Sequence, residues 1–75
     1  MKRTNKAQAP PTSLRDARKR LGITGEGLAE RLGVTRPSVS QWENGHTKPS
    51  GPARRLIAVV LDVPVDLVQS WFEAA

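Results

Sequence analysis

The sequence predicts an all-α fold built from five short helices. Apolar side chains recur three or four residues apart in five successive segments, and no segment alternates in the manner of a strand. A hydroxyl-bearing residue or a proline precedes each segment, and glycines follow the first two, which are the usual signals for helix starts and ends. At 75 residues we expect one small domain with little room for a catalytic cleft.

The first helix is expected to begin after Ser13 and to end at Gly22. Ser13 followed by Asp16 resembles a capping box, in which a hydroxyl and an acid three residues later satisfy the first backbone amides. Arg18 lies at the edge of the apolar stripe. The residues expected to face inward are Leu14, Ala17 and Leu21.

The second helix is expected from about Gly25 to Leu32, with Thr24 as its cap. Gly33 ends it, because a glycine takes the left-handed backbone conformation at no steric cost, and Val34 then turns back into the core. Its inward residues are Leu28, Ala29 and Leu32, of which the small Ala29 leaves room for the next helix to cross.

The third helix is expected from about Arg36 to Asn44, capped by the hydroxyl of Thr35. Pro37 disfavours helical angles at the residue before it, so a start one residue later stays open. Val39 and Trp42 give this helix a narrow inward stripe. The opposite face carries Pro37, Ser40, Gln41 and Asn44, which we expect to point outward.

The fourth helix is expected after Ser50, with Pro52 in its first turn, where a missing N–H does no harm. Pro64 then opens a fifth helix from about Val65 to Phe72. The residues expected to be buried are Ala53, Leu56, Ile57, Val60 and Leu61 in the fourth helix, and Leu67, Val68 and Trp71 share one side of the fifth.

The net charge of +5 is distributed unevenly along the chain. Residues 1–20 hold seven basic side chains and one acid, whereas residues 56–75 hold three acids and no base. We therefore expect a polyanion to lie near the front of the chain and the end to face away from it. Residues 1–11 are interpreted as a basic, flexible arm and residues 12–75 as the folded domain.

The composition excludes several other classes of function. The chain has no cysteine, so it has neither a disulfide framework nor a cysteine-rich zinc site. His46 is the only histidine and has no second ligand at metal spacing, and Ser13 has no base in a recognisable arrangement, so we expect no metal, no cofactor and no enzyme chemistry. No apolar run spans a bilayer and the basic start lacks a signal peptide's hydrophobic region, so we expect a cytoplasmic protein without membrane association.

The outward face of the third helix is typical of a surface that reads bases. The amide of Gln41 can bond N6 and N7 of an adenine together. The planar fork of Arg36 suits either guanine O6 and N7 or a phosphate, and the sequence leaves both open. Pro37 offers only apolar surface, such as a contact with a thymine methyl group, while Ser40 completes the exposed row.

Residues 28–45, LAERLGVTRPSVSQWENG, followed by Thr47, Lys48 and Pro49, resemble the helix-turn-helix of the XRE, or Cro and phage-repressor, family. The resemblance covers roughly Leu14 to Val68. It implies a compact five-helix, lambda-repressor-like domain whose third helix enters the major groove of double-stranded DNA. The phosphate contacts that it implies fall on Thr35, Ser38, Asn44, Thr47 and Lys48.

Two further positions follow from the residues and from the resemblance. Glu43 falls near the core edge, where an acid needs a partner, and Arg18 is the expected one; relatives often join these positions as an ion pair. Gly25 departs from the family pattern, because many relatives carry a glutamine there whose side chain a glycine cannot supply.

The end of the chain suggests a contact with a second subunit. Trp71 and Phe72 are large rings that a lone small domain has difficulty covering, so we expect them, with Leu67, at a homodimer interface. The alternative for Trp71 is that it closes the domain's own core. In the family, two subunits place their reading helices about 34 Å apart, which implies a palindromic operator.

The sequence therefore predicts a small homodimeric repressor of its own operon. The segment KPSGPARRL is also similar to that of small phage and plasmid regulators, so one alternative is an antitoxin that binds a toxin or another operon-encoded partner. A second alternative is a protein-interaction module on the same scaffold.

Overall fold

Five α-helices joined by short turns make up the part of the chain that the computed structural model describes, residues 9–73. They are α1 (Leu14–Arg20), α2 (Gly25–Leu32), α3 (Arg36–Glu43), α4 (Gly51–Leu61) and α5 (Val65–Phe72). The five expected helices are all present, and residues 9–73 contain no strand. Helix α3 begins at Arg36, the earlier of its two possible starts, and ends one residue before the expected Asn44.

Four of the five helices start at a hydroxyl cap. In each, the cap oxygen accepts a hydrogen bond from the backbone N–H three residues later, at 2.9 to 3.3 Å. The pairs are Ser13 with Asp16, Thr24 with Gly27, Thr35 with Ser38, and Ser50 with Ala53. Each bond satisfies an amide that the helix itself leaves unpaired and is worth about 1 kcal/mol. Helix α5 starts at Pro64 without a side-chain cap.

The same four helices end in one type of turn. A backbone N–H bonds the carbonyl five residues earlier, and the residue before it has a left-handed φ of 57° to 79°. The bonded pairs are Ile23 with Arg18, Val34 with Ala29, His46 with Gln41, and Val63 with Ala58. This Schellman arrangement returns Ile23, Val34 and Val63 to the core, where they pack against the buried cluster.

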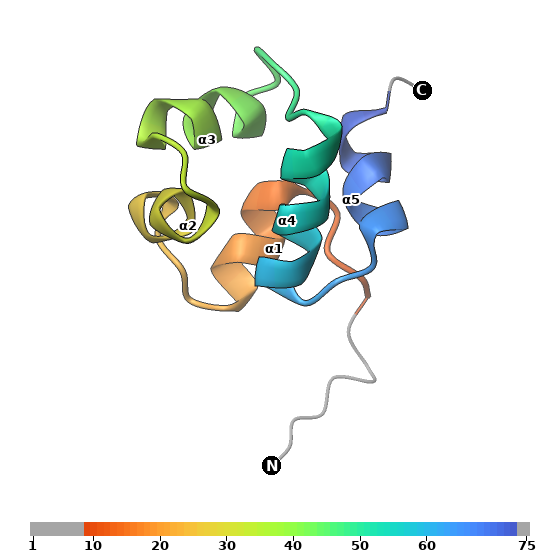
Figure 1. The fold of residues 1–75 in the computed structure, drawn as a ribbon. Helices are drawn as coiled ribbons and strands as arrows, with labels where there is room; N and C mark the ends of the chain where they lie inside the picture. The colour runs from red at the N-terminus through yellow and green to blue at the C-terminus, as the bar shows by residue number, and fades with distance from the viewer. Residues whose placement is uncertain (1–8, 74–75) are drawn as a thin grey trace.

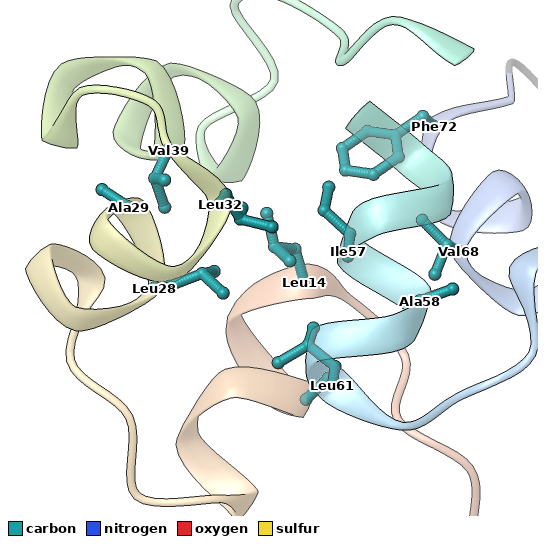
Figure 2. Packing of buried hydrophobic residues seen from close by; sticks show 11 residues of the cluster. Leu14, Leu28, Ala29, Leu32, Val39, Ile57, Ala58, Leu61, Val68 and Phe72 are labelled. Carbon is teal, nitrogen blue, oxygen red and sulfur yellow. The ribbon is translucent and has the colours of Figure 1, made fainter. Parts of the chain in front are cut away.

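The core is shared by all five helices. Figure 2 shows Leu14, Leu32 and Ile57 converging from α1, α2 and α4, with Val39 of α3 on one side and Val68 of α5 on the other. The other buried members are Ala17, Leu28, Ala29, Ala58, Leu61 and Phe72. Burying an aliphatic side chain of this kind contributes roughly 1.5 to 3 kcal/mol, so these contacts hold the helices in place.

Two residues expected in the core lie at the surface. Leu21 is 51% exposed because α1 ends at Arg20, which leaves Leu21 in the turn after the last buried residue of that helix. Leu56 is 41% exposed, since α4 packs between α2 and α5 and buries an arc centred on Ile57, Ala58 and Leu61. The buried face of α4 therefore includes Ala58 in place of the expected Leu56, while Ile57 and Leu61 are buried as expected.

The helices are arranged so that α3 lies at the periphery. In Figure 1, α2 and α3 occupy one side of the molecule and α5 the other, with α1 and α4 between them. Helix α3 packs mainly on α2 and touches α1 through its end. Among residues 9–73, no helix combines the length and the apolar character that crossing a bilayer requires.

The conformation of Gly33 gives a test of the turn between α2 and α3. A Cβ at Gly33 or at Gly25 would meet no atom within 4 Å, but only Gly33 has a positive φ, 73°. We expect Gly33→Ala to lower the free energy of unfolding by about 1 to 2 kcal/mol, because a left-handed conformation is strained for alanine. Gly25→Ala is the matched control and should raise it by about 0.5 kcal/mol, since alanine restricts the unfolded chain. Urea denaturation measures both, and equal effects of one sign would contradict the account.

Candidate nucleic-acid interface

Helix α3 is fixed on its inner side and free on its outer side. Val39 is 1% exposed and packs with Ala29 in the cluster between α2 and α3, while Trp42 is half-buried against the same cluster. At the start of the helix, the hydroxyls of Thr35 and Ser38 lie 3.0 Å apart. The inner contacts therefore set the position of α3 without using its outward side chains.

The outer side of α3, with Asn44 just beyond its end, is a row of exposed side chains that are polar except for Pro37, as the sequence predicts. Arg36, Pro37, Ser40, Gln41 and Asn44 are all exposed. The amide of Asn44 donates to the hydroxyl of Ser40 at 3.4 Å, whereas the side chain of Gln41 makes no hydrogen bond to another residue of the described part of the chain. Its amide is consequently available for an external partner.

The turn after α3 continues this exposed row. Thr47 and Lys48 are exposed, and the backbone N–H groups of His46 and Thr47 bond the carbonyl of Gln41 at 2.9 and 3.5 Å. The turn is thereby folded back over the end of α3. The residues expected to contact phosphates thus lie at both ends of α3: Thr35 and Ser38 at its start, and Asn44, Thr47 and Lys48 at and after its end.

An ion pair locks the end of α3 to α1. The guanidinium of Arg18 donates to both carboxylate oxygens of Glu43, at 2.7 and 3.1 Å, and also to the carbonyl of Ile23 at 3.0 Å. The side chains of Arg18 and Glu43 are only 13% and 5% exposed. The pair expected from the sequence therefore forms, and it joins α1, the turn before α2, and α3.

Arg15 is a second arginine on Glu43 that the sequence reasoning missed. Its Nε donates to Glu43 Oε1 at 3.3 Å and its Nη2 to Asn44 Oδ1 at 3.5 Å. A signal was present, because Arg15 precedes Arg18 by three residues and so shares its side of α1. Burial raises the pKa of the Glu43 carboxyl, but the hydrogen bonds and charges of the two arginines outweigh it and hold that pKa below its ordinary value.

The expected basic arm falls largely outside the described residues. Its basic side chains, Lys2, Arg3 and Lys6, lie within residues 1–8. Residues 9–12 are tied along α1 and α5: Arg20 donates to the carbonyl of Ala9, the Thr12 N–H to Asp16, and the Trp71 indole to the carbonyl of Pro11. In Figure 1 this segment runs down the side of the molecule away from α3.

One of the two rings at the end of α5 is covered within a single chain: the expectation that a lone domain has difficulty covering both is wrong for Phe72, while Trp71 remains half-buried. Phe72 is buried, and its ring lies edge-on to Trp71 with 6.5 Å between centroids. Trp71 and Leu67 are half-buried. Apart from Leu21 after α1, the exposed large apolar side chains of residues 9–73 lie on α4, where Leu56 is 41% and Val59 is 75% exposed.

This geometry is that of a DNA-binding helix-turn-helix unit: a supporting helix, a tight left-handed turn, and a second helix with a free polar face. A family model described as helix-turn-helix matches residues 14–68. The chain therefore belongs to the XRE-type helix-turn-helix family of transcriptional regulators. This family comprises DNA-binding regulators rather than enzymes, in agreement with the prediction that the chain is not an enzyme.

Two curated relatives carry corresponding names. An uncharacterized HTH-type transcriptional regulator of Methanothermobacter thermautotrophicus is 51% identical over 39 residues, which cover 52% of this chain and 56% of the relative. The uncharacterized HTH-type transcriptional regulator YqaE of Bacillus subtilis is 33% identical over 54 residues, which cover 72% of this chain and 47% of the relative. The chain thus spans about half the length of each relative. No solved structure gives a significant match.

The Arg18–Glu43 pair predicts a pH-dependent contribution to stability. Glu43→Gln leaves the partly buried Arg18 without its counter-charge and should lower the free energy of unfolding by about 1.5 to 3 kcal/mol at neutral pH. Because the folded-state pKa of Glu43 lies below its ordinary value of about 4.5, its contribution is present above about pH 4.5 and is lost as the pH falls through the folded-state pKa. The difference between wild type and variant should therefore shrink in acid.

Urea denaturation between neutral and acid pH measures this difference. Glu30→Gln, at an exposed position on α2, is the control and should change stability by less than about 0.5 kcal/mol at each pH. A Glu43→Gln variant as stable as the control would show that the ion pair does not hold α3.

Proposed function

We propose that this protein is a sequence-specific repressor that binds a short inverted repeat in double-stranded DNA as a homodimer, in the promoter of its own operon. The observation that supports the proposal most directly is the free polar face of α3, from Arg36 to Asn44, on a helix whose inner face is buried. A B-form major groove about 12 Å wide admits a helix with such a face.

Side chains of α3 and of the residues on either side of it contact two different parts of the DNA, the base edges and the phosphates. Gln41, exposed and without a partner in the described residues, bonds the edge of an adenine, and Pro37 contacts a thymine methyl group. Arg36 contacts a guanine or a phosphate, and Ser40 adjoins the reading position. Thr35, Ser38, Asn44, Thr47 and Lys48 hold the backbone on either side and set the register of the helix in the groove.

Dimerisation gives the two reading helices their spacing. Two copies of α3 about 34 Å apart meet successive major grooves on one side of a duplex, which requires an inverted repeat. The exposed Leu56 and Val59 of α4 favour a contact with another protein chain and supply apolar surface that the buried Phe72 does not. The same surface supports the alternative, an antitoxin-type regulator that also binds an operon-encoded protein.

Selection of bound fragments from random duplex tests the function. We expect a symmetric motif with half-site centres about one helical turn apart, and affinity that falls steeply between low and moderate salt. A single unpaired half-site would contradict the homodimer. Absence of salt-dependent binding would contradict DNA recognition altogether and leave the scaffold as a protein-interaction module. Lower transcription from the operon after deletion of the gene would contradict repression.

Two substitutions separate base reading from phosphate contact. Gln41→Ala should reduce the binding free energy by about 1 to 3 kcal/mol through the loss of a contact with one base pair, and it should relax the preference for a particular base at that position. Lys48→Ala should weaken all sequences alike and flatten the dependence of log K on log salt by about one. Binding titrations on the selected duplex and on its single-base variants measure both effects.

The matched control for the first substitution is Gln69→Ala, which removes an exposed glutamine from α5. It should leave both the affinity and the base preference of the protein unchanged. If Gln41→Ala and Lys48→Ala lose specificity and salt dependence in equal measure, the assignment of roles within the interface is wrong.

A further inference from the structure

The turn that carries Thr47 and Lys48 borders an open hollow of about 330 Å³. The hollow is lined by Trp42, Gly45, Lys48, Trp71 and Phe72 among others. Side chains do not fill this space, so packing fixes the turn mainly at the buried Pro49. Between α3 and Pro49, the position of Thr47 and Lys48 depends on the hydrogen bonds at the two ends of the turn.

One end of the turn is held by a hydrogen bond to α3, and the other by the burial of Pro49 together with a hydrogen bond from an arginine. The carbonyl of Gln41 accepts from the His46 N–H at 2.9 Å. At the far end, Nε of Arg54 on α4 donates to the carbonyl of Pro49 at 3.1 Å. Pro49 itself is buried and directly follows Lys48.

Arg54 is in turn held from two other directions. Its Nη1 donates to Glu73 Oε2 at 3.1 Å, just beyond the end of α5, and its guanidinium carbon lies 5.7 Å from the centroid of the Phe72 ring. The Arg54 side chain is only 16% exposed. The planar guanidinium thus joins the last residue of the turn to α4 and α5 through separate N–H groups, which the point charge of a lysine cannot reproduce.

We propose that Arg54 is a positioning residue for DNA binding: held by Glu73 and Phe72, it fixes the Pro49 carbonyl and thereby places Lys48 against a backbone phosphate. This inference rests on the proposed function and names a residue that acts through Lys48. Arg54 does not serve as a phosphate ligand itself, because its Nε and Nη1 are engaged and its side chain is largely buried.

The first test compares Arg54→Lys, Lys48→Ala and the double variant by the salt dependence of binding to the selected duplex. Arg54→Lys keeps the charge but loses the fork, so it should flatten the slope of log K against log salt by about one, as Lys48→Ala does. The double variant should lose no more than either single one, since both changes remove the same contact. A wild-type slope for Arg54→Lys, with a flattened slope for Lys48→Ala, would overturn the proposal.

A second test uses Glu73→Gln, whose side chain is 62% exposed, so that the domain keeps its fold if Arg54→Lys does not. Removing an acid ordinarily strengthens binding to a polyanion. Loss of the carboxylate that holds Arg54 should instead lower the affinity for the selected duplex by about two- to threefold, because the phosphate contact of Lys48 is then partly lost. Asp66→Asn removes an exposed acid of α5 outside this arrangement and should leave the affinity unchanged or slightly raised.

Different outcomes contradict the proposed function and the positioning role of Arg54. Wild-type protein that shows no salt-dependent binding would overturn the proposed function, and the role of Arg54 with it. If the wild type binds and Lys48→Ala flattens the slope, but Glu73→Gln binds more tightly than wild type, only the positioning role is wrong.

Discussion

The structure depends on one largely enclosed ion pair, between Arg18 of α1 and Glu43 at the end of α3. Van der Waals packing of Val39 and Trp42 places α3 on the domain. Because this apolar stripe is narrow, packing alone does not fix the rotation of α3 about its own axis. Arg18 donates two hydrogen bonds to Glu43 and a third to the carbonyl of Ile23. These bonds fix the rotation of α3, because the N–H groups of a planar guanidinium point in fixed directions. The direction in which Gln41 points therefore follows from a contact on the opposite side of the helix.

Features encoded within a few residues could be predicted from the sequence. The caps at Ser13, Thr24, Thr35 and Ser50, and the turn at Gly33, are local hydrogen-bonding choices, so the helix bounds follow closely from residue type. The outward face of α3 was predictable for a similar reason, since helical periodicity alone separates Gln41 from Val39. Among the predicted features, only the Arg18–Glu43 ion pair joins positions far apart in the sequence. Periodicity places Glu43 near the core edge, and the family resemblance supports Arg18 as its partner.

Features set by tertiary packing could not be predicted in this way. Leu56 and Ile57 are adjacent apolar residues, and which of them is buried depends on how α4 sits between α2 and α5. Phe72 is covered by the buried cluster, with Arg54 over its ring, and the contact with Arg54 joins residues 18 positions apart that no pattern in the chain links. The contacts of Arg54 with Glu73 and of Arg15 with Glu43 likewise form only when distant helices come together.

Helix α3 and the turn after it form the surface that, as we propose, meets DNA. The most direct measurement is a titration of isotopically labelled protein with the selected duplex, following backbone and side-chain amide shifts by NMR. We predict the largest changes at residues 36–41 and 47–48, including the Gln41 side-chain amide, with little change in α5. Changes concentrated in α5 or on the outer face of α4, with the Gln41 amide unmoved, would contradict the account.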